Sequence, residues 1–196
     1  YRRPWKVCVD SERLPFSPDS IDCCISNLAF AWALDFDRLL AEVRRVLARD
    51  GLLIFSTLGP DTLCEVRRCL TEFSGDQHVH PFLDMHDIGD MLMRSQFAEP
   101  VMDAEFINMT YEDVRDLMRD IKAIGAHNAM QERHRGLTGK QRMDRFIQAY
   151  EQFRSNGRLP STWEVVYGHA WAPGQVQDEE GVTRVAIESI TRRKQG

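Results

Sequence analysis

Short β-like runs alternate with helical periodicity along most of the chain, and this alternation constrains the fold more than any other feature. The residues from Phe36 to Leu47 place apolar side chains at i, i+3, i+4, i+7 and i+11, and Gly51 follows them, which predicts an amphipathic helix with a glycine stop. Such alternation is typical of an α/β fold with a mostly parallel sheet, in which we expect the strand at 21–25 to be buried on both faces. Strands are expected at residues 5–9, 21–25, 52–57, 101–109 and 163–171.

The size and composition exclude several classes of protein. A chain of 196 residues with 43% hydrophobic and 28% charged residues is long enough for one domain with a buried core, which excludes a disordered chain. The longest apolar run is the seven residues 28–34, whereas a helix that crosses a bilayer needs about 20, so no membrane association is expected. The net charge of −5 argues against a nucleic-acid binder.

The cysteines and histidines indicate a reducing compartment and no metal site. The five cysteines are odd in number and form neither a C-x-x-C pair nor a Cys/His set at zinc spacing. We therefore expect buried thiols and a cytoplasmic location. His78, His80 and His86 with Asp84 match no standard metal spacing either.

Two further helices are expected between the last two strands. Thr110 and Asp113 resemble a capping box ahead of the first helix, and Thr138 begins the second. Beyond residue 173 the chain turns polar and charged, with a marginal edge strand at 183–190. The expected organisation is one domain over residues 1–173, a helical lid over about 110–158 within it, and a polar tail over 174–196.

Two polar residues end neighbouring strands of the expected sheet, Asp10 after the run at 5–9 and Asn27 after the run at 21–25. Because ligands of open α/β sheets bind at the carboxyl ends of the strands, these two residues are expected to lie together at a binding edge. A carboxylate there can accept a hydrogen bond from an exocyclic amine while the backbone N–H of Ser11 donates to a ring nitrogen, an arrangement that reads adenine. The alternative is an aspartate that only caps the following turn.

Several motifs resemble a known family. The segments 10–16, 20–28 and 45–57 look like the middle of a class I S-adenosylmethionine-dependent methyltransferase. Over residues 5–173 the chain is similar to the malonyl-acyl-carrier-protein O-methyltransferases of biotin synthesis, in their proteobacterial form. The segments that carry this similarity are 26–32, 55–63, 82–90, 117–128, 135–140 and 164–171.

The resemblance implies an enzyme that transfers a methyl group from S-adenosylmethionine to the free carboxylate of a malonyl group on acyl carrier protein. It implies a Rossmann-like methyltransferase sheet, mostly parallel with an antiparallel C-terminal strand, and a helical lid insertion. No acid or base is expected, because a carboxylate is already a nucleophile and the protein has only to align and desolvate the reactants. The cofactor-binding residues that it implies are Asp10 and Ser11 for adenine, with Asn27 and Leu28 at the methionine end.

Substrate-binding residues are expected in the lid and beside the acceptor. A lid arginine or lysine could hold the malonyl carboxylate, the alternative being a solvated helix face. Trp32 and Tyr167 could line the acceptor pocket or simply pack in the core. Residues 131–158 carry seven Lys/Arg against three acids, a local +4 that suits an acidic carrier protein. The candidate substrate residues are Trp32, Lys122, His127, Asn128, Arg133, Arg135 and Tyr167.

One departure from the family pattern is marked. The chain contains no G-x-G motif, its first glycine is Gly51, and no acidic residue follows a second strand to hold the ribose. We therefore expect a chain that lacks the N-terminal portion of the family, is inactive by itself, and exposes an apolar edge at 21–25. This exposure predicts either a homodimer through that edge or disorder near the N-terminus. The alternatives are a related methyltransferase for another small acid or a protein, and a non-catalytic interaction domain.

Overall fold

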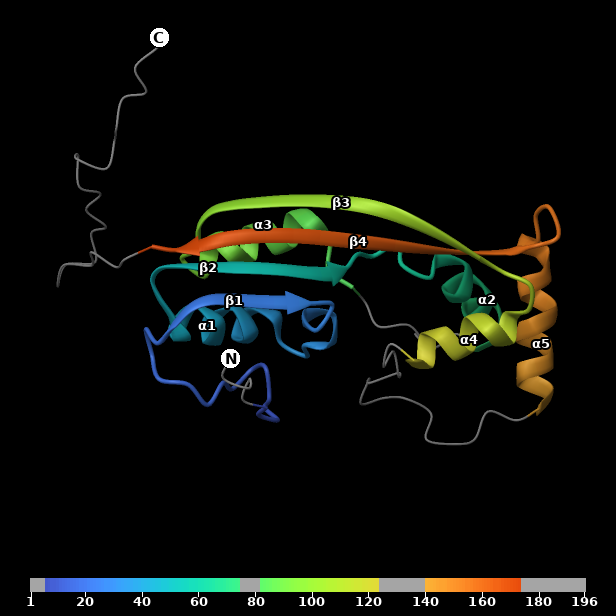
Figure 1. Cartoon of the computed structure of the whole chain (residues 1–196). Helices are drawn as coiled ribbons and strands as arrows, with labels where there is room; N and C mark the ends of the chain where they lie inside the picture. The colour runs from blue at the N-terminus through green and yellow to red at the C-terminus, as the bar shows by residue number, and fades with distance from the viewer. Residues whose placement is uncertain (1–5, 75–81, 124–139, 174–196) are drawn as a thin grey trace, which may run out of the picture.

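A computed structural model describes residues 6–74, 82–123 and 140–173, which form a mixed four-stranded sheet with helices. The sheet order is β1-β2-β4-β3, with β1 parallel to β2 and β4 antiparallel to both of its neighbours, so β1, β2 and β3 run in one direction (Figure 1). The α/β class and the antiparallel C-terminal strand are therefore confirmed. The strands are β1 (Ile21–Asn27), β2 (Leu47–Leu58), β3 (Ala98–Tyr111) and β4 (Leu159–Ala172).

The helices lie close to where periodicity and capping residues predict them. Asp35 and Asp84 cap α1 and α3, since their side chains accept hydrogen bonds from the N–H groups of Arg38 and His86. The helices are α1 (Phe36–Val46), α2 (Cys64–Ser74), α3 (Met85–Arg94), α4 (Val114–Ala123) and α5 (Lys140–Tyr150), with the short 3₁₀ turns η1 (Phe30–Trp32) and η2 (Glu151–Phe153).

The predicted capping box at the start of α4 is wrong. The Asp113 side chain does accept from the N–H of Arg115, 2.7 Å away, but Thr110 still belongs to β3. Thr110 pairs with Pro160 and Tyr111 with Leu159, so pairing with β4 holds this backbone extended up to Tyr111. The predicted lid accordingly begins two residues inside a strand.

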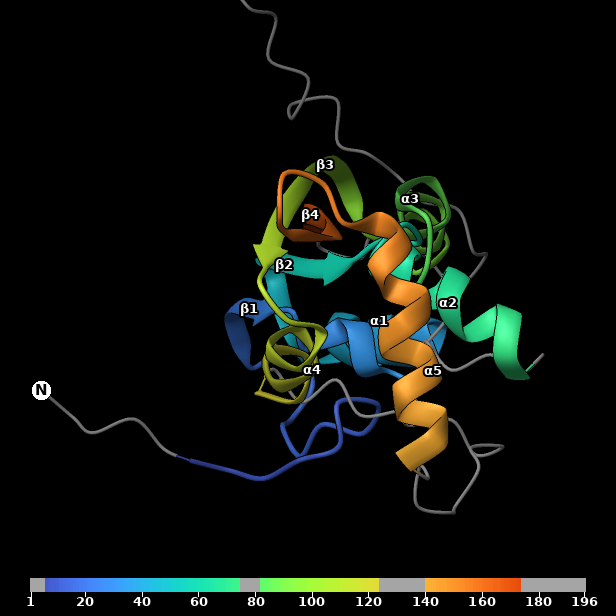
Figure 2. The ribbon, with the colours of Figure 1, turned by 90° about the vertical axis from the view of Figure 1, so that its right-hand side faces the viewer.

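Two apolar clusters hold the layers together. In the first, α1 and α3 cover one face of the sheet, where Leu39 and Val43 pack with Ile88 against the buried residues Leu53 and Phe55 (Figure 2). The second gathers α2, α4 and α5 around the ends of β3 and β4 that extend past β2 (Figure 1). The second cluster therefore lies on the side of the molecule toward which the carboxyl ends of β1 and β2 point.

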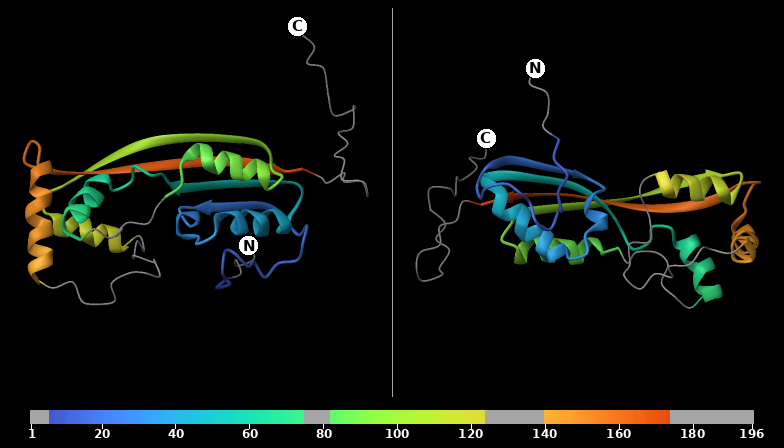
Figure 3. Two further views of the ribbon diagram at one scale, coloured as in Figure 1. Left: turned by 180° about the vertical axis from the view of Figure 1, so that it is seen from behind. Right: turned by 90° about the horizontal axis from the view of Figure 1, so that it is seen from below.

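The opposite face of the sheet carries exposed apolar side chains, because no described helix covers it beside β1 and β2 (Figure 3). Ile25 is 72% exposed, Val101 53%, and Ile54 40%. The expectation that residues 21–25 are buried on both faces is therefore wrong, whereas the expected exposure of this edge is confirmed, since β1 is the outer strand of the described sheet. Pairing of this edge with a second copy stays a prediction for analytical ultracentrifugation.

Three other expectations fail or lie outside the described residues. Residues 6–9 are exposed and form no strand, because no described strand lies beside them to pair with. Cys69 is buried, but Cys8 and Cys23 are exposed, so the thiols are not all core residues. The tail over 174–196 lies outside the described residues.

Among the helices of the described ranges, none combines the length and apolarity that a bilayer crossing needs.

Candidate cofactor and substrate site

Asp10 begins a tight turn at the expected binding edge. Its Oδ1 accepts from the N–H of Glu12 at 3.0 Å, and its carbonyl accepts from the N–H of Arg13, also at 3.0 Å. One carboxylate oxygen thus caps the turn, as the alternative interpretation expected. Oδ2 of Asp10 and the N–H of Ser11 have no hydrogen-bond partner in the described part of the chain, so an acceptor and a donor stay available side by side.

Glu12 fastens this turn to the start of α1. Its Oε1 accepts from the N–H of Leu34 at 2.7 Å and from the N–H of Asp35 at 3.0 Å. These bonds fasten the Asp10 turn to the N-terminus of α1, the helix that follows β1 in the chain. No strand leads into Asp10, because residues 6–9 form none, and its meeting with Asn27 stays a prediction.

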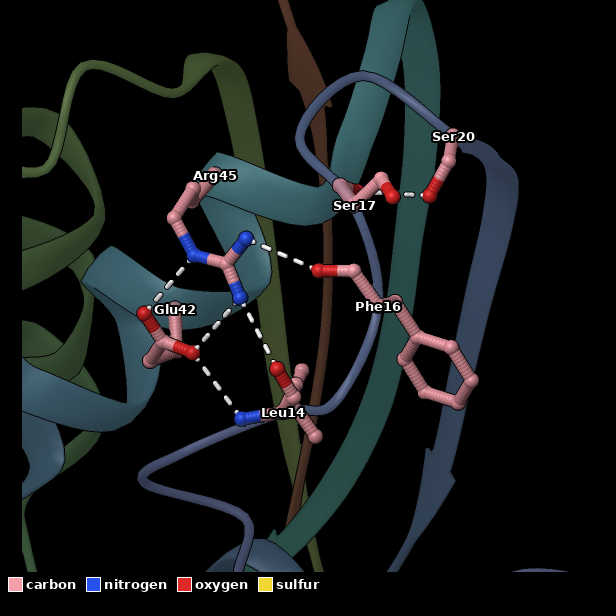
Figure 4. Close-up of polar contacts among 6 residues, drawn as sticks. All are labelled: Leu14, Phe16, Ser17, Ser20, Glu42 and Arg45. Atoms are coloured by element: carbon pink, nitrogen blue, oxygen red, sulfur yellow. Dashed lines mark hydrogen bonds and ion pairs between the residues drawn. The ribbon is translucent and has the colours of Figure 1, made fainter.

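An ion pair on α1 holds the next part of the same loop (Figure 4). Arg45 and Glu42 are joined by two bonds of 2.8 and 2.9 Å. The guanidinium of Arg45 also donates to the carbonyls of Phe16 and Leu14, each at 2.9 Å, and the N–H of Leu14 donates to Glu42 at 2.9 Å. The hydrogen bond from Arg45 holds the pKa of Glu42 below its ordinary value of 4.5. The loop before β1 is thereby fixed to the helix after it.

The carboxyl end of β1 is fastened to β2 by a serine that sequence reasoning missed. Ser56 Oγ donates to Asn27 Oδ1 at 2.8 Å, and the N–H of Leu28 donates to both the carbonyl and the Oγ of Ser56, at 3.0 and 3.1 Å. Leu28 has a φ of 56°, in the left-handed region that a branched side chain rarely adopts. Strained backbone of this kind gathers at functional sites. The only sequence signal for Ser56 was a hydroxyl near the end of a predicted strand.

Tyr167 and Trp32 lie near this strand end, in different surroundings. Tyr167 is the register partner of Ser56, as Asn27 is on the other side, so the three residues form one row across β1, β2 and β4. The phenol of Tyr167 donates to Glu105, and this bond raises the pKa of Tyr167. Trp32 packs against the second apolar cluster, with its ring centroid 6.2 Å from that of Phe82.

Most of the expected lid residues cannot be placed. Lys122 is exposed near the end of α4, whereas His127, Asn128, Arg133 and Arg135 lie outside the described residues.

Two of the basic residues in the segment expected to bind the carrier protein form ion pairs within the chain. Arg154 pairs with Glu151 at 2.6 Å, and Arg158 pairs with Glu112 at 3.2 Å. Both also donate to backbone carbonyls, Arg154 to Glu112 and Gly157, and Arg158 to Thr110. They therefore contribute less free positive charge than their number in the sequence indicates.

The described residues contain no group of three or more His, Cys, Asp and Glu side chains that could hold a metal ion. His86 does contact Asp84, with Nδ1 2.9 Å from Oδ1, but this contact lies at the N-terminus of α3, where Asp84 is the cap. His78 and His80 lie outside the described residues.

Comparisons with known proteins agree on one family. A methyltransferase domain family matches residues 2–55. The malonyl-acyl-carrier-protein O-methyltransferase of Laribacter hongkongensis is 54% identical over 172 residues, which are 88% of this chain and 58% of that protein. The enzyme of the same name from Legionella pneumophila is 35% identical over 196 residues, 98% of this chain and 69% of that protein.

The fold has a match among solved structures. A crystal structure described as a methyltransferase from Bacillus halodurans C-125 superposes with a TM-score of 0.54 at 15% identity, covering 85% of this chain and 70% of that one. This similarity concerns the fold alone. The chain spans 54–64% of the length of the curated relatives to which it is 50–54% identical. By its identity to curated relatives along nearly its whole length, the chain belongs to the malonyl-acyl-carrier-protein O-methyltransferase family.

Proposed function

We propose that the protein transfers a methyl group from S-adenosylmethionine to the free carboxylate of a malonyl group on acyl carrier protein, a step of biotin synthesis. The observation that supports the proposal is the identity of 54% to a protein of that name, in a chain with Asn27 at the carboxyl end of β1 and the Asp10 turn bonded through Glu12 to the start of α1. The carboxyl ends of the strands are where α/β sheets bind their ligands.

The residues present fit the adenine and methionine ends of the cofactor. Oδ2 of Asp10 and the N–H of Ser11 offer an acceptor beside a donor, which matches the amine and ring nitrogen of adenine. Asn27 and Leu28 would hold the methionine end. S-Adenosylmethionine supplies, when bound, a methyl group that is already activated for transfer. The 196-residue sequence contains no G-x-G motif.

The remaining task of the protein is to hold the acceptor carboxylate and to exclude water. A carboxylate needs no base to act as a nucleophile, so no titrating residue is required. We assign the binding of the carboxylate to a cation of the lid over 110–158, with Lys122, Arg133 and Arg135 as candidates, and we keep His127 and Asn128 as further candidate substrate residues. Trp32 and Tyr167 would border the acceptor. Cytoplasmic location and docking of acidic acyl carrier protein on the lid belong to the same proposal.

Asp10→Asn tests the adenine contact in the natural protein. The amide keeps the oxygen that caps the turn but replaces the second acceptor with a donor, which faces the adenine amine unfavourably. Because a hydrogen bond to a charged group contributes about 1.5–3 kcal/mol, the KM for S-adenosylmethionine should rise at least about tenfold with malonyl-acyl carrier protein as acceptor. Asp90→Asn, on an exposed position of α3, is the matched control and should leave KM unchanged.

The same assay separates the alternatives. Methyl transfer to another small acid or to a protein, with none to malonyl-acyl carrier protein, would contradict the assigned acceptor. Absence of S-adenosylmethionine binding by calorimetry would favour a non-catalytic interaction domain. Equal KM values for wild type and Asp10→Asn would show that Asp10 does not read adenine.

A further inference from the structure

Ser56 bonds to both Asn27 and Leu28 at the end of β1, although Ser56 itself belongs to the neighbouring strand. It belongs to β2 and is 7% exposed, whereas Asn27 is exposed at the end of β1. Its hydroxyl contacts both Asn27 Oδ1, at 2.8 Å, and the N–H of Leu28, at 3.1 Å. One buried hydroxyl therefore touches the two residues assigned to the methionine end of the cofactor.

The directions of these two hydrogen bonds fix the orientation of the Asn27 amide. A hydroxyl has one proton to donate, and a backbone N–H can only donate. In the structure Ser56 Oγ accepts from the N–H of Leu28 and donates its one proton to Asn27 Oδ1, so the oxygen is the atom of Asn27 that faces the hydroxyl. The amide Nδ2, which carries two donor protons, is then the part of Asn27 left for a ligand.

The same hydroxyl supports the backbone turn that follows the strand. Leu28 adopts a φ of 56°, which persists in a non-glycine residue only where surrounding contacts impose it. The N–H of Leu28 is shared between the carbonyl and the hydroxyl of Ser56, at 3.0 and 3.1 Å. Loss of the hydroxyl would therefore free both the amide of Asn27 and part of the restraint on Leu28.

We propose that Ser56 is a positioning residue that presents the Nδ2 of Asn27 to a carboxylate oxygen in the site. The inference rests on the proposed function, which brings two carboxylates to this edge, one on the methionine end of the cofactor and one on the malonyl acceptor. Two N–H donors on an exposed amide match either of them. Ser56 touches neither, and acts through Asn27.

Ser26 provides a matched control one residue before Asn27. It is also a buried serine near the end of β1, 8% exposed, but its Oγ has no hydrogen-bond partner among the residues that the structure describes. Ser26→Ala therefore removes a hydroxyl of the same kind from the same neighbourhood without disturbing a bond. Ser56→Thr keeps the hydroxyl and should behave as the wild type if the hydroxyl is what matters.

The test measures two affinities in the natural protein, by calorimetry for S-adenosylmethionine and by KM for malonyl-acyl carrier protein. Ser56→Ala should weaken one of them about tenfold, as should Asn27→Ala, and the double variant should be no weaker than either. If decarboxylated S-adenosylmethionine binds wild type and Ser56→Ala equally, the cofactor carboxylate is the ligand; if only the KM for the carrier rises, the malonyl carboxylate is. Unchanged affinities, effects that multiply in the double variant, or an equal loss in Ser26→Ala would overturn the proposal.

A ligand-free measurement separates this inference from the proposed function. The NMR order parameter of the Asn27 side-chain amide should fall in Ser56→Ala and stay high in Ser26→Ala and Ser56→Thr. If the order parameter falls in Ser56→Ala but the wild type transfers no methyl group, the proposed function is refuted and the positioning role of Ser56 is supported. An unchanged order parameter in Ser56→Ala would refute the positioning role whatever the activity.

Discussion

Replacing Gly168 with alanine tests how tightly the sheet packs against α1 and α3. A Cβ at this position of β4 would lie 2.4 Å from Phe55 Cζ and 2.8 Å from the sulfur of Met102, closer than non-bonded atoms approach. Phe55 is 2% exposed, so its ring cannot swing into solvent and must displace other core side chains. Overpacking of this kind costs about 1–3 kcal/mol, from which the usual gain of alanine over glycine in a strand, about 0.5–1 kcal/mol, is subtracted. The difference spans about 0–2.5 kcal/mol, and because an approach of 2.4 Å to a buried ring belongs to the costly end of that range, we expect a net loss of about 1–2 kcal/mol.

Urea denaturation followed by circular dichroism measures this loss. With an m-value of about 2 kcal/mol/M, the midpoint should fall by about 0.5–1 M at unchanged m. Gly89→Ala is the control: a Cβ there meets nothing closer than Met102 Cγ at 4.0 Å, and alanine inside α3 should stabilise the protein by about 1 kcal/mol. Phe55→Leu should restore part of the stability of Gly168→Ala, giving a favourable coupling energy in the double-mutant cycle. A Gly168→Ala protein as stable as the wild type, or a cycle without coupling, would refute this description of the core.

Two further predictions follow from ionisable groups. Glu42→Gln should loosen the loop held by Arg45. Because the folded-state pKa of Glu42 lies below 4.5, the stability advantage of the wild type should be complete above that pH and should shrink as the pH falls through the lowered pKa. Urea denaturation of both proteins at pH 3 to 7 measures this difference, and a difference that does not change with pH would contradict the prediction. Burial raises the pKa of Tyr111 to about 12, so in an ultraviolet titration Tyr111→Phe should lose one of the phenols that ionise above 10. Loss of a phenol that ionises near 10 would instead mean that Tyr111 is solvated.

Local signals in the sequence were sufficient for the helices and for the order of the elements. Phe36 to Val46 form the expected helix because their spacing and the Asp35 cap act within the segment itself. The burial of 21–25 and the strand at 5–9 were predicted wrongly, because burial and pairing depend on which segments lie alongside. An apolar run has the same sequence pattern whether another element covers it or leaves it exposed, as Ile25 is in the described structure.

The site divides in the same way. Asp10 and Asn27 were singled out because each follows a strand-like run directly, but only Asn27 ends a strand in the structure. Ser56 and Glu12 could not be singled out, since their bonds reach residues 22 to 29 positions away, whose register no local pattern specifies. The sequence contains the residue types that the family needs, but the hydroxyl that orients Asn27 becomes visible only when β1 and β2 are aligned.

The position of β4 has a consequence for how the sheet is assembled. β4 is the last described strand to be synthesised, yet it lies between β2 and β3, and these two are not neighbours in the sheet. A ribosome must therefore deliver β4 before β3 can join the sheet, and the register partners Gly51 and Ala172 are 121 residues apart in the chain. Until then β2 and β3 each present an unpaired edge to the cell, and contacts so distant in sequence form slowly. The nascent chain is thus committed to a late closing step, during which protection by chaperones matters most.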